Sequence, residues 1–394
     1  DYGIGKFRGI RTRESPEGSQ EVLEIEYEDE ARLFVALDQA HLVSRYIGTG
    51  KKAPKLSRLG DKRWSRLRRD AENSILDYAG RLLAIQAERA ASQRGFAHPP
   101  DNKWQWEFEH AFIYKETPDQ LRAIEETKID MESEKPMDRL ICGDVGFGKT
   151  EVAIRAAFKA VMSGKQVAIL APTTVLAEQH FRNFRERMSD FPVKIETLSR
   201  YRTATEQRRT LVNLAAGSTD IVIGTHRVIS KDVRFKDLGL VVVDEEQRFG
   251  VHHKERFKEM WRFVDVLTLS ATPIPRTLYL SMMGVREMSV IDTPPPNRRP
   301  VATTVCPYDE RIIRSAIEKE MARQGQVFFL HNRVKSIQGV KRRIEDLVPG
   351  ARVEVGHGQM ESEELEDVMS RFIRHEFDVL VCTTIIESGI DMPT

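Results

Sequence analysis

The sequence carries a glycine-rich segment whose residue types and spacing suit the binding of phosphate groups. Gly143-Asp144-Val145-Gly146-Phe147-Gly148-Lys149-Thr150 fits the pattern GxxxxGK[ST], and it follows a strand-like run and precedes a helical stretch. Glycines let backbone N–H groups curl around phosphates, and the N-terminus of the helix adds partial positive charge. We therefore expect Lys149 to reach the β- and γ-phosphates of a nucleotide and the Thr150 hydroxyl to bind Mg²⁺. The alternative is a glycine-rich turn that binds nothing.

A second segment, nearly a hundred residues further on, carries the acidic groups that such a loop needs. Leu240–Val243 runs directly into Asp244-Glu245-Glu246-Gln247, which places acids at the carboxyl end of a buried strand. We expect Asp244 to hold Mg²⁺ and Glu245 to orient or deprotonate an attacking water, and we count Gln247 with them as a catalytic candidate. The alternative is an acidic turn after an edge strand.

The elements that must position these groups follow an α/β rhythm from about residue 112. Short apolar runs without strict alternation, which are typical of parallel strands buried on both faces, are separated by helical stretches. These runs are Arg139–Cys142, Val167–Ala171, Ile221–Ile223, Leu240–Val243 and Val266–Ser270. The run of consecutive prolines within Thr293–Pro300 predicts a boundary, so we expect one lobe over 112–293. A similar but incomplete second lobe over 294–394 is predicted from the runs Val327–Leu330, Val353–Val355 and Val379–Cys382.

The first 111 residues follow a different pattern. Residues 1–50 alternate apolar and polar positions between glycines, which predicts a small SH3-like or Tudor-like β-barrel. We expect this barrel to bind protein through Val22–Tyr27 as an edge strand, with Leu23 and Ile25 as contact residues, although Leu23 could simply be core. Residues 51–111 form a basic linker and a long amphipathic helix, and the basic stretch could lie on DNA, pack on a lobe or remain solvated.

Composition sets the broad class of protein. The chain has 394 residues, which suggests two or three domains, and 40% hydrophobic with 31% charged residues is ordinary for a globular protein. No stretch approaches the ~18 uncharged apolar residues of a membrane helix, so we expect no membrane partner. Cys142, Cys306 and Cys382 are far apart, and we interpret them as reduced core thiols of a cytoplasmic protein. Because the final residues GIDMPT fall inside a predicted domain, we expect the chain to be a fragment.

Five segments together resemble the ordered motifs of superfamily 2 helicases and translocases. They are Ala171–Thr174, Ile223–Arg227, Asp244–Gln247, Ser270–Pro273 and Thr383–Asp391. The segments DEEQRFGV and SATPIPRT are similar to those of RecG-type enzymes, which move on duplex DNA. At the front, DYGIGKFRGI, RLFVALDQAHLVSRYIG and LSRLGDKRWSR resemble the RNA-polymerase-interacting barrel and relay helix of bacterial transcription-repair coupling factors. Two RecA-like lobes are the fold that this resemblance implies.

The resemblance also implies a function and its partners. Members of that family engage a stalled RNA polymerase, push it along DNA with ATP, dislodge it and recruit excision repair. ATP and Mg²⁺ are therefore the expected cofactors, and double-stranded DNA and the polymerase β subunit the expected partners. Excision-repair proteins would be recruited through modules that this sequence does not contain. The last helicase motif, with its arginine finger, is not present either, so we expect ATP binding with feeble turnover.

Site residues follow from the resemblance position by position. Gln120 resembles the glutamine that reads adenine, with Phe112 as the ring that covers the base, and the alternative for Gln120 is an exposed side chain behind an N-cap at Thr117. Ser270 and Thr272 resemble the motif that couples the nucleotide site to DNA, and Glu387, Gly389 and Asp391 would face the cleft between the lobes. Expected contacts to DNA phosphates are Thr173, Thr174, Thr225, His226, Arg227, Asn332, Arg333, Gly358, Gln359 and Thr383, where N-caps and a loop histidine are the alternative in the first lobe.

Two other functions remain open from the sequence alone. One is a RecG-like enzyme that remodels branched DNA, which would share the motor segment but carry a different front domain. The other is a non-enzymatic transcription regulator of the CarD type, which would share the front barrel but have no phosphate loop after it.

Overall fold

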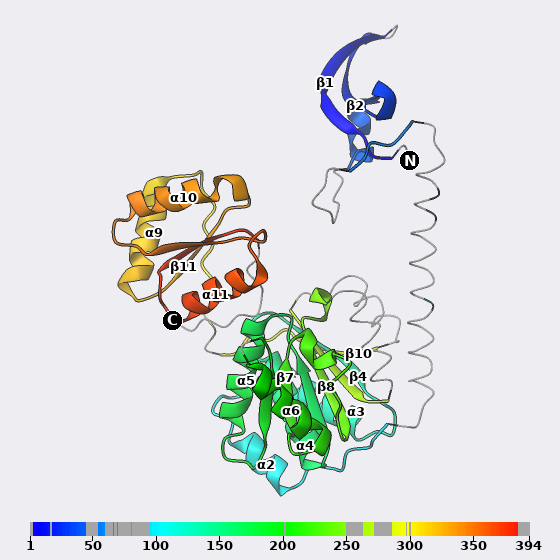
Figure 1. Ribbon diagram of the computed structural model, residues 1–394, viewed down its shortest axis with the longest axis vertical. Helices are drawn as coiled ribbons and strands as arrows, with labels where there is room; N and C mark the ends of the chain where they lie inside the picture. The colour runs from blue at the N-terminus through cyan, green and yellow to red at the C-terminus, as the bar shows by residue number, and fades with distance from the viewer. Residues whose placement is uncertain are drawn as a thin grey trace. The chain divides into compact units, whose positions relative to one another are not determined.

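The computed structural model describes residues 3–15, 18–44, 54–59, 66, 69, 80, 95–200, 202–249, 263–271, 286–296, 298 and 301–384 (Figure 1). The chain divides into two units, which span residues 1–84 and 85–394. The predicted amphipathic helix between the barrel and the lobes lies almost wholly outside the described residues. Of its positions, Arg66, Arg69 and Gly80 are helical.

The first unit contains a three-stranded antiparallel sheet. Its strands are β1 (Lys6–Ser15), β2 (Gly18–Glu26) and β3 (Arg32–Ala36), and short 3-10 helices follow β2 (η1, Glu28–Glu30) and β3 (η2, Leu37–Leu42). The strand order is β1-β2-β3, so β2 pairs with a neighbour on each side. The antiparallel sheet confirms the sequence prediction, but the prediction that Val22–Tyr27 is an edge is wrong. An alternating pattern cannot distinguish a central from an edge strand, because both strand types alternate.

The core of this small sheet lies on β2. Val22 and Ile25 on this strand and Tyr27 directly after it are buried, and Leu23 is half-buried. Ile25 therefore belongs to the core and is not the surface contact that we had expected. Glu24 is also buried on this strand, and its carboxylate pairs with Arg11 from β1 and with Arg32 from β3. These two cations neutralise a charge that burial would otherwise make costly.

The first lobe is built on a seven-stranded sheet in which every neighbouring pair is parallel. The order is β10-β4-β9-β8-β5-β7-β6. The strands are β4 (Asp138–Gly143), β5 (Gln166–Leu170), β6 (Ile195–Leu198), β7 (Ile221–Gly224), β8 (Leu238–Asp244), β9 (Asp265–Ser270) and β10 (Glu287–Ile291). Five of them match the predicted runs. β6 and β10 were not predicted, because polar residues interrupt the apolar runs in both.

Helices cover both faces of this sheet (Figure 1). The described helices are α2 (Lys103–His110), α3 (Pro118–Met131), α4 (Lys149–Met162), α5 (Thr174–Arg187) and α6 (Ala204–Ala216), with 3-10 turns η3 (His226–Ile229) and η4 (Glu246–Arg248). Successive residues of β5 point to opposite faces, so Ile169 joins one buried cluster with Phe158, while Leu170 joins the other with Leu214. Burial on both faces explains why the strands are apolar throughout.

The described part of the second lobe is a smaller parallel sheet. Its order is β11-β13-β12, and β13 pairs in parallel with each neighbour. The elements are α9 (Glu310–Ala322), β11 (Val327–Leu330), α10 (Val334–Leu347), β12 (Val353–Gly356), α11 (Ser362–Ile373) and β13 (Val379–Cys382). All three strands confirm predicted runs. Cys142 and Cys382 are buried thiols as expected, but Cys306 is exposed, so its assignment to a core was wrong.

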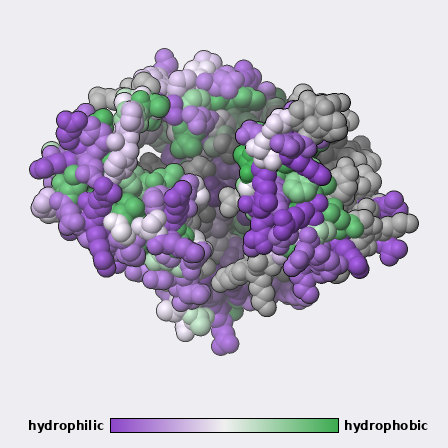
Figure 2. Space-filling model, turned by 90° about the horizontal axis from the view of Figure 1, so that it is seen from above, coloured by the Kyte–Doolittle hydropathy of each residue, from purple (hydrophilic) through white to green (hydrophobic). Residues whose placement is uncertain are grey.

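Within the described residues, no helix is both long enough and apolar enough to cross a bilayer. On the face shown in Figure 2, hydrophilic residues predominate and apolar residues form separate small areas.

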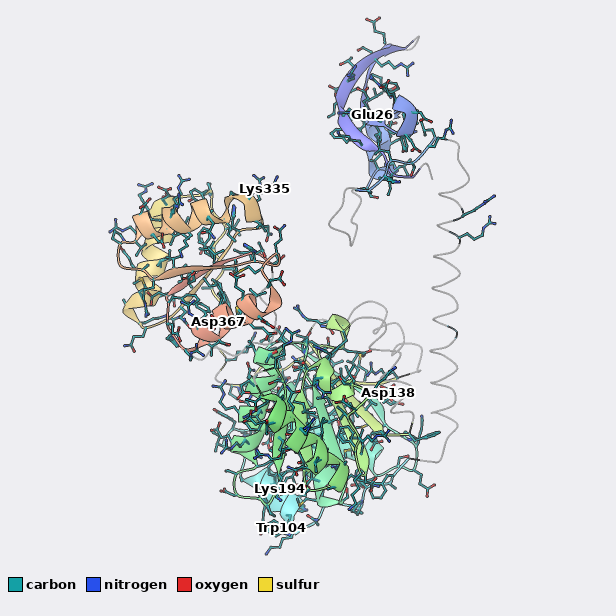
Figure 3. The ribbon with its side chains drawn as sticks, in the orientation of Figure 1. Glu26, Trp104, Asp138, Lys194, Lys335 and Asp367 are labelled. Atoms are coloured by element: carbon teal, nitrogen blue, oxygen red, sulfur yellow. The ribbon has the colours of Figure 1, made fainter. Side chains whose placement is uncertain are left out.

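The segment that precedes residue 112 packs into the first lobe. Gly95 N–H donates to the Glu134 carbonyl over 2.9 Å, and His98 N–H donates to the Met131 carbonyl over 2.8 Å. Phe108 on α2 is fully buried and stacks on Phe158 of α4, with ring centroids 4.0 Å apart. Trp104, on the same helix, remains exposed at the surface of the lobe (Figure 3). Helix α2 is thus part of the lobe's core.

We therefore expect Phe108→Ala to lower the free energy of unfolding by about 3–5 kcal/mol, because it removes a fully buried ring. Trp106→Ala, on the exposed side of the same helix, is the matched control and should cost about 0.5 kcal/mol or less. Urea denaturation followed by circular dichroism measures both values. Equal effects of the two substitutions would show that α2 is not packed as described.

Candidate functional site

The predicted site residues of the first lobe gather at one edge of its sheet. Because all seven strands are parallel, their carboxyl ends lie at the same edge. The phosphate loop follows β4, Ser270 ends β9 and Asp244 ends β8. Thr173 and Thr225 follow β5 and β7. Segments separated by more than a hundred residues in sequence are thereby collected along one line.

The phosphate loop has the backbone that its glycines permit. Gly146 and Gly148 both have φ of +80°, a region that residues with a Cβ rarely adopt. A Cβ at Gly148 would also collide with the Gln120 side chain. Lys149, the first residue of α4, donates from Nζ to the carbonyls of Gly143 (2.6 Å) and Asp144 (3.0 Å). Burial lowers the pKa of this amine, although Asp244, Glu245 and Asp144 oppose that shift.

Gln120 joins helix α3 to the phosphate loop. Its Oε1 accepts the Thr117 N–H (2.8 Å), and its backbone N–H donates to Thr117 Oγ1 (3.3 Å), which completes a capping box. Its Nε2 donates to the Phe147 carbonyl over 2.8 Å. With 7% of its surface exposed, Gln120 is not the exposed residue of the alternative interpretation, although the N-cap at Thr117 is present.

Phe112 is backed by two arginines that the sequence did not single out. The Arg155 guanidinium lies 5.3 Å from the centre of the Phe112 ring, and that of Arg187 lies 5.5 Å away. Arg155 is buried and pairs with Glu116 (2.5 Å) and Glu151 (2.8 Å). These pairs outweigh the desolvation of Arg155 and raise its pKa. The i,i+4 spacing of Glu151 and Arg155 on α4 was the available signal, but it usually marks an exposed helix face.

The acidic motif is folded back onto the end of β9. Glu245 has φ of +49°, and its N–H donates to the Leu269 carbonyl over 2.9 Å. Its Oε1 accepts the Ala271 N–H over 3.0 Å. Gln247 Nε2 donates to the other Glu245 oxygen, and Ser270 Oγ donates to Gln247 Oε1 over 3.4 Å.

These contacts join the two motifs physically. Burial raises the pKa of the Glu245 carboxyl group, and the hydrogen bond from Ala271 opposes that shift. Ser270 reaches Glu245 through a single side chain, that of Gln247. Thr272, the other residue expected to couple nucleotide and DNA, lies outside the described residues.

Asp244 has a partner that sequence reasoning missed. His180, from the middle of α5, lies with Nε2 2.8 Å from Asp244 Oδ2. The histidine is buried. In sequence it stands 64 residues away, in a helix whose interior matches none of the recognised motifs, so only the fold brings the two together.

The first-lobe candidates for DNA contact differ in how far their side chains are exposed. Thr173 accepts the Leu176 N–H and caps α5. The side chains of Thr174 and Thr225 are buried, whereas His226 is exposed. Arg227 is bound on both terminal guanidinium nitrogens by Asp232, at 2.7 and 2.6 Å. Of these five residues, His226 has the most exposed side chain.

The second-lobe candidates also lie at the carboxyl ends of parallel strands. Asn332 and Arg333 follow β11 and are exposed, as are Gly358 and Gln359 after β12. Thr383 follows β13 and is half-buried, and its N–H donates to the Gly356 carbonyl over 3.2 Å. The remaining candidates, Glu387, Gly389 and Asp391, lie outside the described residues.

A buried arginine holds the other end of the acidic motif. Arg286 pairs with Asp138 at 2.8 Å and with Glu246 at 2.9 Å, and it donates to Thr268 as well. Burial alone would lower the pKa of Arg286, but the two carboxylates outweigh it and raise that pKa. Asp138, at the start of β4, is labelled in Figure 3. Arg286 thus ties Glu246 to the base of the strand that leads into the phosphate loop.

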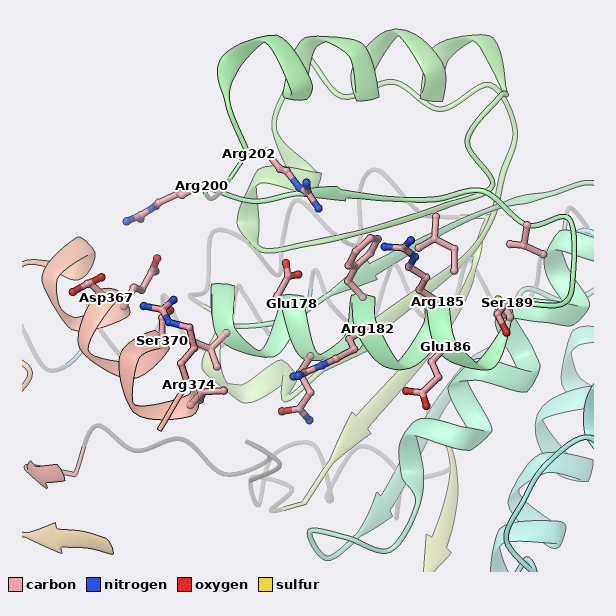
Figure 4. Close-up of a pocket in the computed structure, with 18 of the residues that line it drawn as sticks. Glu178, Arg182, Arg185, Glu186, Ser189, Arg200, Arg202, Asp367, Ser370 and Arg374 are labelled. Carbon is pink, nitrogen blue, oxygen red and sulfur yellow. The ribbon is translucent and has the colours of Figure 1, made fainter. Parts of the chain in front are cut away.

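A groove of about 1420 Å³ runs along the outer side of α5, away from these groups (Figure 4). Its lining includes none of the phosphate-loop residues and not Asp244. Arg182, Arg185, Arg200 and Arg202 line it, but so do the acids Glu178, Glu186, Glu363, Glu366 and Asp367. Because the two signs nearly balance, the groove does not suit a polyanion such as nucleic acid.

Family models match three parts of the chain. Residues 1–47 match the CarD-like/TRCF RID domain, residues 117–280 the DEAD/DEAH box helicase, and residues 310–394 the helicase conserved C-terminal domain. A helicase model behind the CarD-like model excludes a regulator that consists of the front domain alone.

Curated relatives match along the entire chain. The chain is 54% identical over 393 residues to the transcription-repair-coupling factor of Bacillus subtilis, and 49% identical over 392 residues to that of Staphylococcus aureus. Along its whole length it is therefore similar to one segment of the transcription-repair-coupling factors. All of this chain is covered, and it spans about a third of the length of those relatives, 33% and 34% respectively.

Solved structures give the same fold for the motor part. The structure of RecG bound to a three-way DNA junction has a TM-score of 0.66 and 27% identity, over 100% of this chain and 65% of that one. Mss116p bound to single-stranded RNA and AMP-PNP has a TM-score of 0.55 at 19% identity, over 75% of this chain and 65% of that one, and shows the fold alone. The lobes of this chain thus have the RecA-like fold of superfamily 2 helicases, as the sequence predicted.

Replacing the buried arginine of the acidic motif tests whether it holds this edge together. We expect Arg286→Met to lower the free energy of unfolding by about 3–5 kcal/mol, because Asp138 and Glu246 would lose their shared cation. Arg298→Met removes an arginine whose partner Asp144 is largely exposed, so it should cost about 1 kcal/mol or less. Urea unfolding measures both variants. A cost for Arg286→Met no larger than that of the control would contradict the anchoring role.

Proposed function

We propose that this chain is the polymerase-binding and motor segment of a transcription-repair-coupling factor. In this proposal the protein uses ATP to move on double-stranded DNA, displaces stalled RNA polymerase and couples transcription to nucleotide excision repair in the cytoplasm. One observation carries the proposal: the phosphate loop after β4 and the Asp244-Glu245 pair after β8 end on the same edge of one parallel sheet. Relatives named transcription-repair-coupling factor along the whole chain support it.

The residues at this edge fit a magnesium–nucleotide complex. Mg²⁺ is usually held by one or two carboxylates together with substrate phosphates, and Thr150 and Asp244 supply a hydroxyl and a carboxylate. Within the described residues, no cluster of three or more His, Cys, Asp or Glu side chains could hold a metal ion without such phosphates. When bound, the cation neutralises charge on the phosphates.

The chain's own residues then have separate tasks. Lys149 exchanges the carbonyls of Gly143 and Asp144 for phosphate oxygens, which satisfies its ammonium group equally well. Glu245, held by Ala271 and Gln247, orients the attacking water. Ser270 senses that arrangement through Gln247, so we assign to it the coupling of the nucleotide site to DNA.

Adenine recognition falls to Gln120 and Phe112. An amide that offers a donor and an acceptor suits the edge of adenine. Both groups of Gln120 are bonded within the chain, so the bond to Phe147 is the one to be exchanged when the base binds. Phe112, fixed against Arg155 and Arg187, covers the base.

DNA is tracked through its phosphates by both lobes. The exposed polar residues after β11 and β12 and the residues after β5 and β7 supply amide, hydroxyl and basic donors, which suit backbone contacts without base reading. The matching structure of RecG is one bound to DNA. A branched-DNA remodelling enzyme is the second candidate, and the CarD-like match at residues 1–47 weighs against it.

The N-terminal sheet is the proposed polymerase-binding surface, with the β subunit as its target. β2 is fully paired, so an added strand must join at β1 or β3. β1 presents Phe7 and Ile10, each more than half exposed. This arrangement makes β1 the better edge and replaces Leu23 and Ile25 as contact residues.

The nucleotide site is tested by Lys149→Ala, with Lys231→Ala, an exposed lysine on the same lobe, as the control. We expect the dissociation constant of a fluorescent ATP analogue with Mg²⁺ to rise about 10–100-fold for Lys149→Ala, because a charged hydrogen-bond donor is lost. The control should leave it unchanged. Wild-type chain that fails to bind the analogue, or Lys149→Ala that binds as tightly, would refute the proposed site.

The polymerase surface is tested by Ile10→Arg, with Val212→Arg on α6 as a matched control. Ile10 is 55% and Val212 62% exposed, so neither change disturbs a core. We expect Ile10→Arg to weaken capture of bacterial core RNA polymerase by about tenfold or more, because a buried charge opposes an apolar contact. Pull-down and thermal melting are measured in parallel. Full capture by Ile10→Arg would exclude β1 as the contact edge.

A further inference from the structure

Helix α5 has one face against the acidic motif and its N-terminus at a predicted DNA contact. Leu176, Ala177, His180 and Phe184 are buried on the inner face, at helical spacing. Glu178, Arg182, Arg185 and Glu186 lie on the outer face, toward the groove in Figure 4. His180 is the member of the inner face that carries a polar group, and that group meets Asp244.

The contact between His180 and Asp244 is buried and has a defined direction. The side chains of the two residues are 4% and 13% exposed. A carboxylate only accepts hydrogen bonds, so Nε2 must donate to Oδ2. His180 Nδ1 is buried and has no hydrogen-bond partner among the described residues. Nε2 is therefore the ring nitrogen through which His180 holds the carboxylate.

This direction leaves Asp244 with one oxygen for a ligand. Oδ2 accepts the hydrogen bond from the histidine N–H, which holds the carboxylate in one orientation. Oδ1 is therefore the oxygen that can face a cation. Partners that orient a metal-binding carboxylate in this way usually matter about 10–100-fold for metal affinity.

Only the helical backbone of α5 separates the same histidine from the N-terminus of that helix. Thr173 caps the helix through the Leu176 N–H, and His180 stands two turns further along. Two turns of helix place the two positions about 10 Å apart along the axis. Because a helix moves as a rigid element, a shift of its N-terminus is transmitted to the His180 ring and so to Asp244.

We propose that His180 is a positioning residue that holds Asp244 in place for Mg²⁺ and links this metal site to duplex DNA bound at the N-terminus of α5. The inference rests on the proposed function and deepens it. His180 touches neither nucleotide nor DNA; it acts through Asp244 and through the helix.

The experiment compares the chain with His180→Leu, which keeps the apolar bulk, and with His180→Gln, whose amide N–H can reach as Nε2 does. Affinity for a fluorescent ATP analogue is measured as Mg²⁺ is titrated, and again in EDTA. We expect the Mg²⁺ midpoint to rise about tenfold for His180→Leu and to stay within about threefold of wild type for His180→Gln. Affinity in EDTA should not change for either variant.

A second arm adds duplex DNA to the same titration. In wild type we expect DNA to lower the Mg²⁺ midpoint about fivefold, because coupling between two sites is reciprocal, and His180→Leu should abolish this shift. His180→Gln should retain it. A DNA shift of full size in His180→Leu would overturn the link through α5.

Thermal melting shows whether each variant is folded. A folded His180→Leu with an unchanged Mg²⁺ midpoint would overturn the positioning role, as would equal shifts for the leucine and glutamine variants. If His180→Leu does not fold, the glutamine variant decides, and a tenfold shift there overturns the role. Failure of the proposed function is recognised separately, because wild type would then show no binding that depends on Lys149.

Discussion

The parallel register of β4, β9, β8, β5 and β7 is the constraint on which the candidate site depends. Each strand ends at the same edge of the sheet. The first few residues of each following loop therefore lie along that edge. A phosphate loop, an acidic pair, a serine and several threonines are thereby brought together from residues 143–270 without any direct bond between most of them. The second lobe repeats this arrangement on β11, β13 and β12.

Buried charges hold that edge in place. Arg155, which pairs with Glu151 on its own helix, fixes the segment that carries Phe112 through Glu116. Arg286 fixes the acidic motif through Asp138 and Glu246. Each arginine has at least two carboxylate partners, which offset the cost of removing its charge from water. Carboxylates thus already pair with both arginines. Lys149, Asp244 and Glu245 remain as the groups that can respond to a ligand.

The sequence predicted the strands of both lobes well, because a strand buried on both faces needs an unbroken apolar run, as in Leu240–Val243. It also predicted the phosphate loop, whose glycines need φ angles that few residues tolerate. It failed for β10, whose run is broken by polar residues, and for the central position of β2, which depends on strand order. Strand order is a property of the whole sheet.

The partners of site residues could not be predicted for a similar reason. His180 and Asp244 are 64 residues apart, and Arg286 stands far from Asp138, so no local pattern joins either pair. The side chains of Thr174 and Thr225 are buried although their motifs resemble DNA-contacting segments. A local sequence motif identifies the segment that takes part in the site, whereas the packing of the folded chain decides which atoms of that segment are accessible.

We propose one edge of the first sheet as the nucleotide site. Hydrogen–deuterium exchange of the chain, with and without Mg²⁺ and a non-hydrolysable ATP analogue, tests it most directly because it reports on each backbone segment. We expect slower exchange at residues 143–150 and 244–247 and unchanged exchange along the groove beside α5. Protection confined to that groove or to the second lobe, with none at residues 143–150, would contradict this proposal.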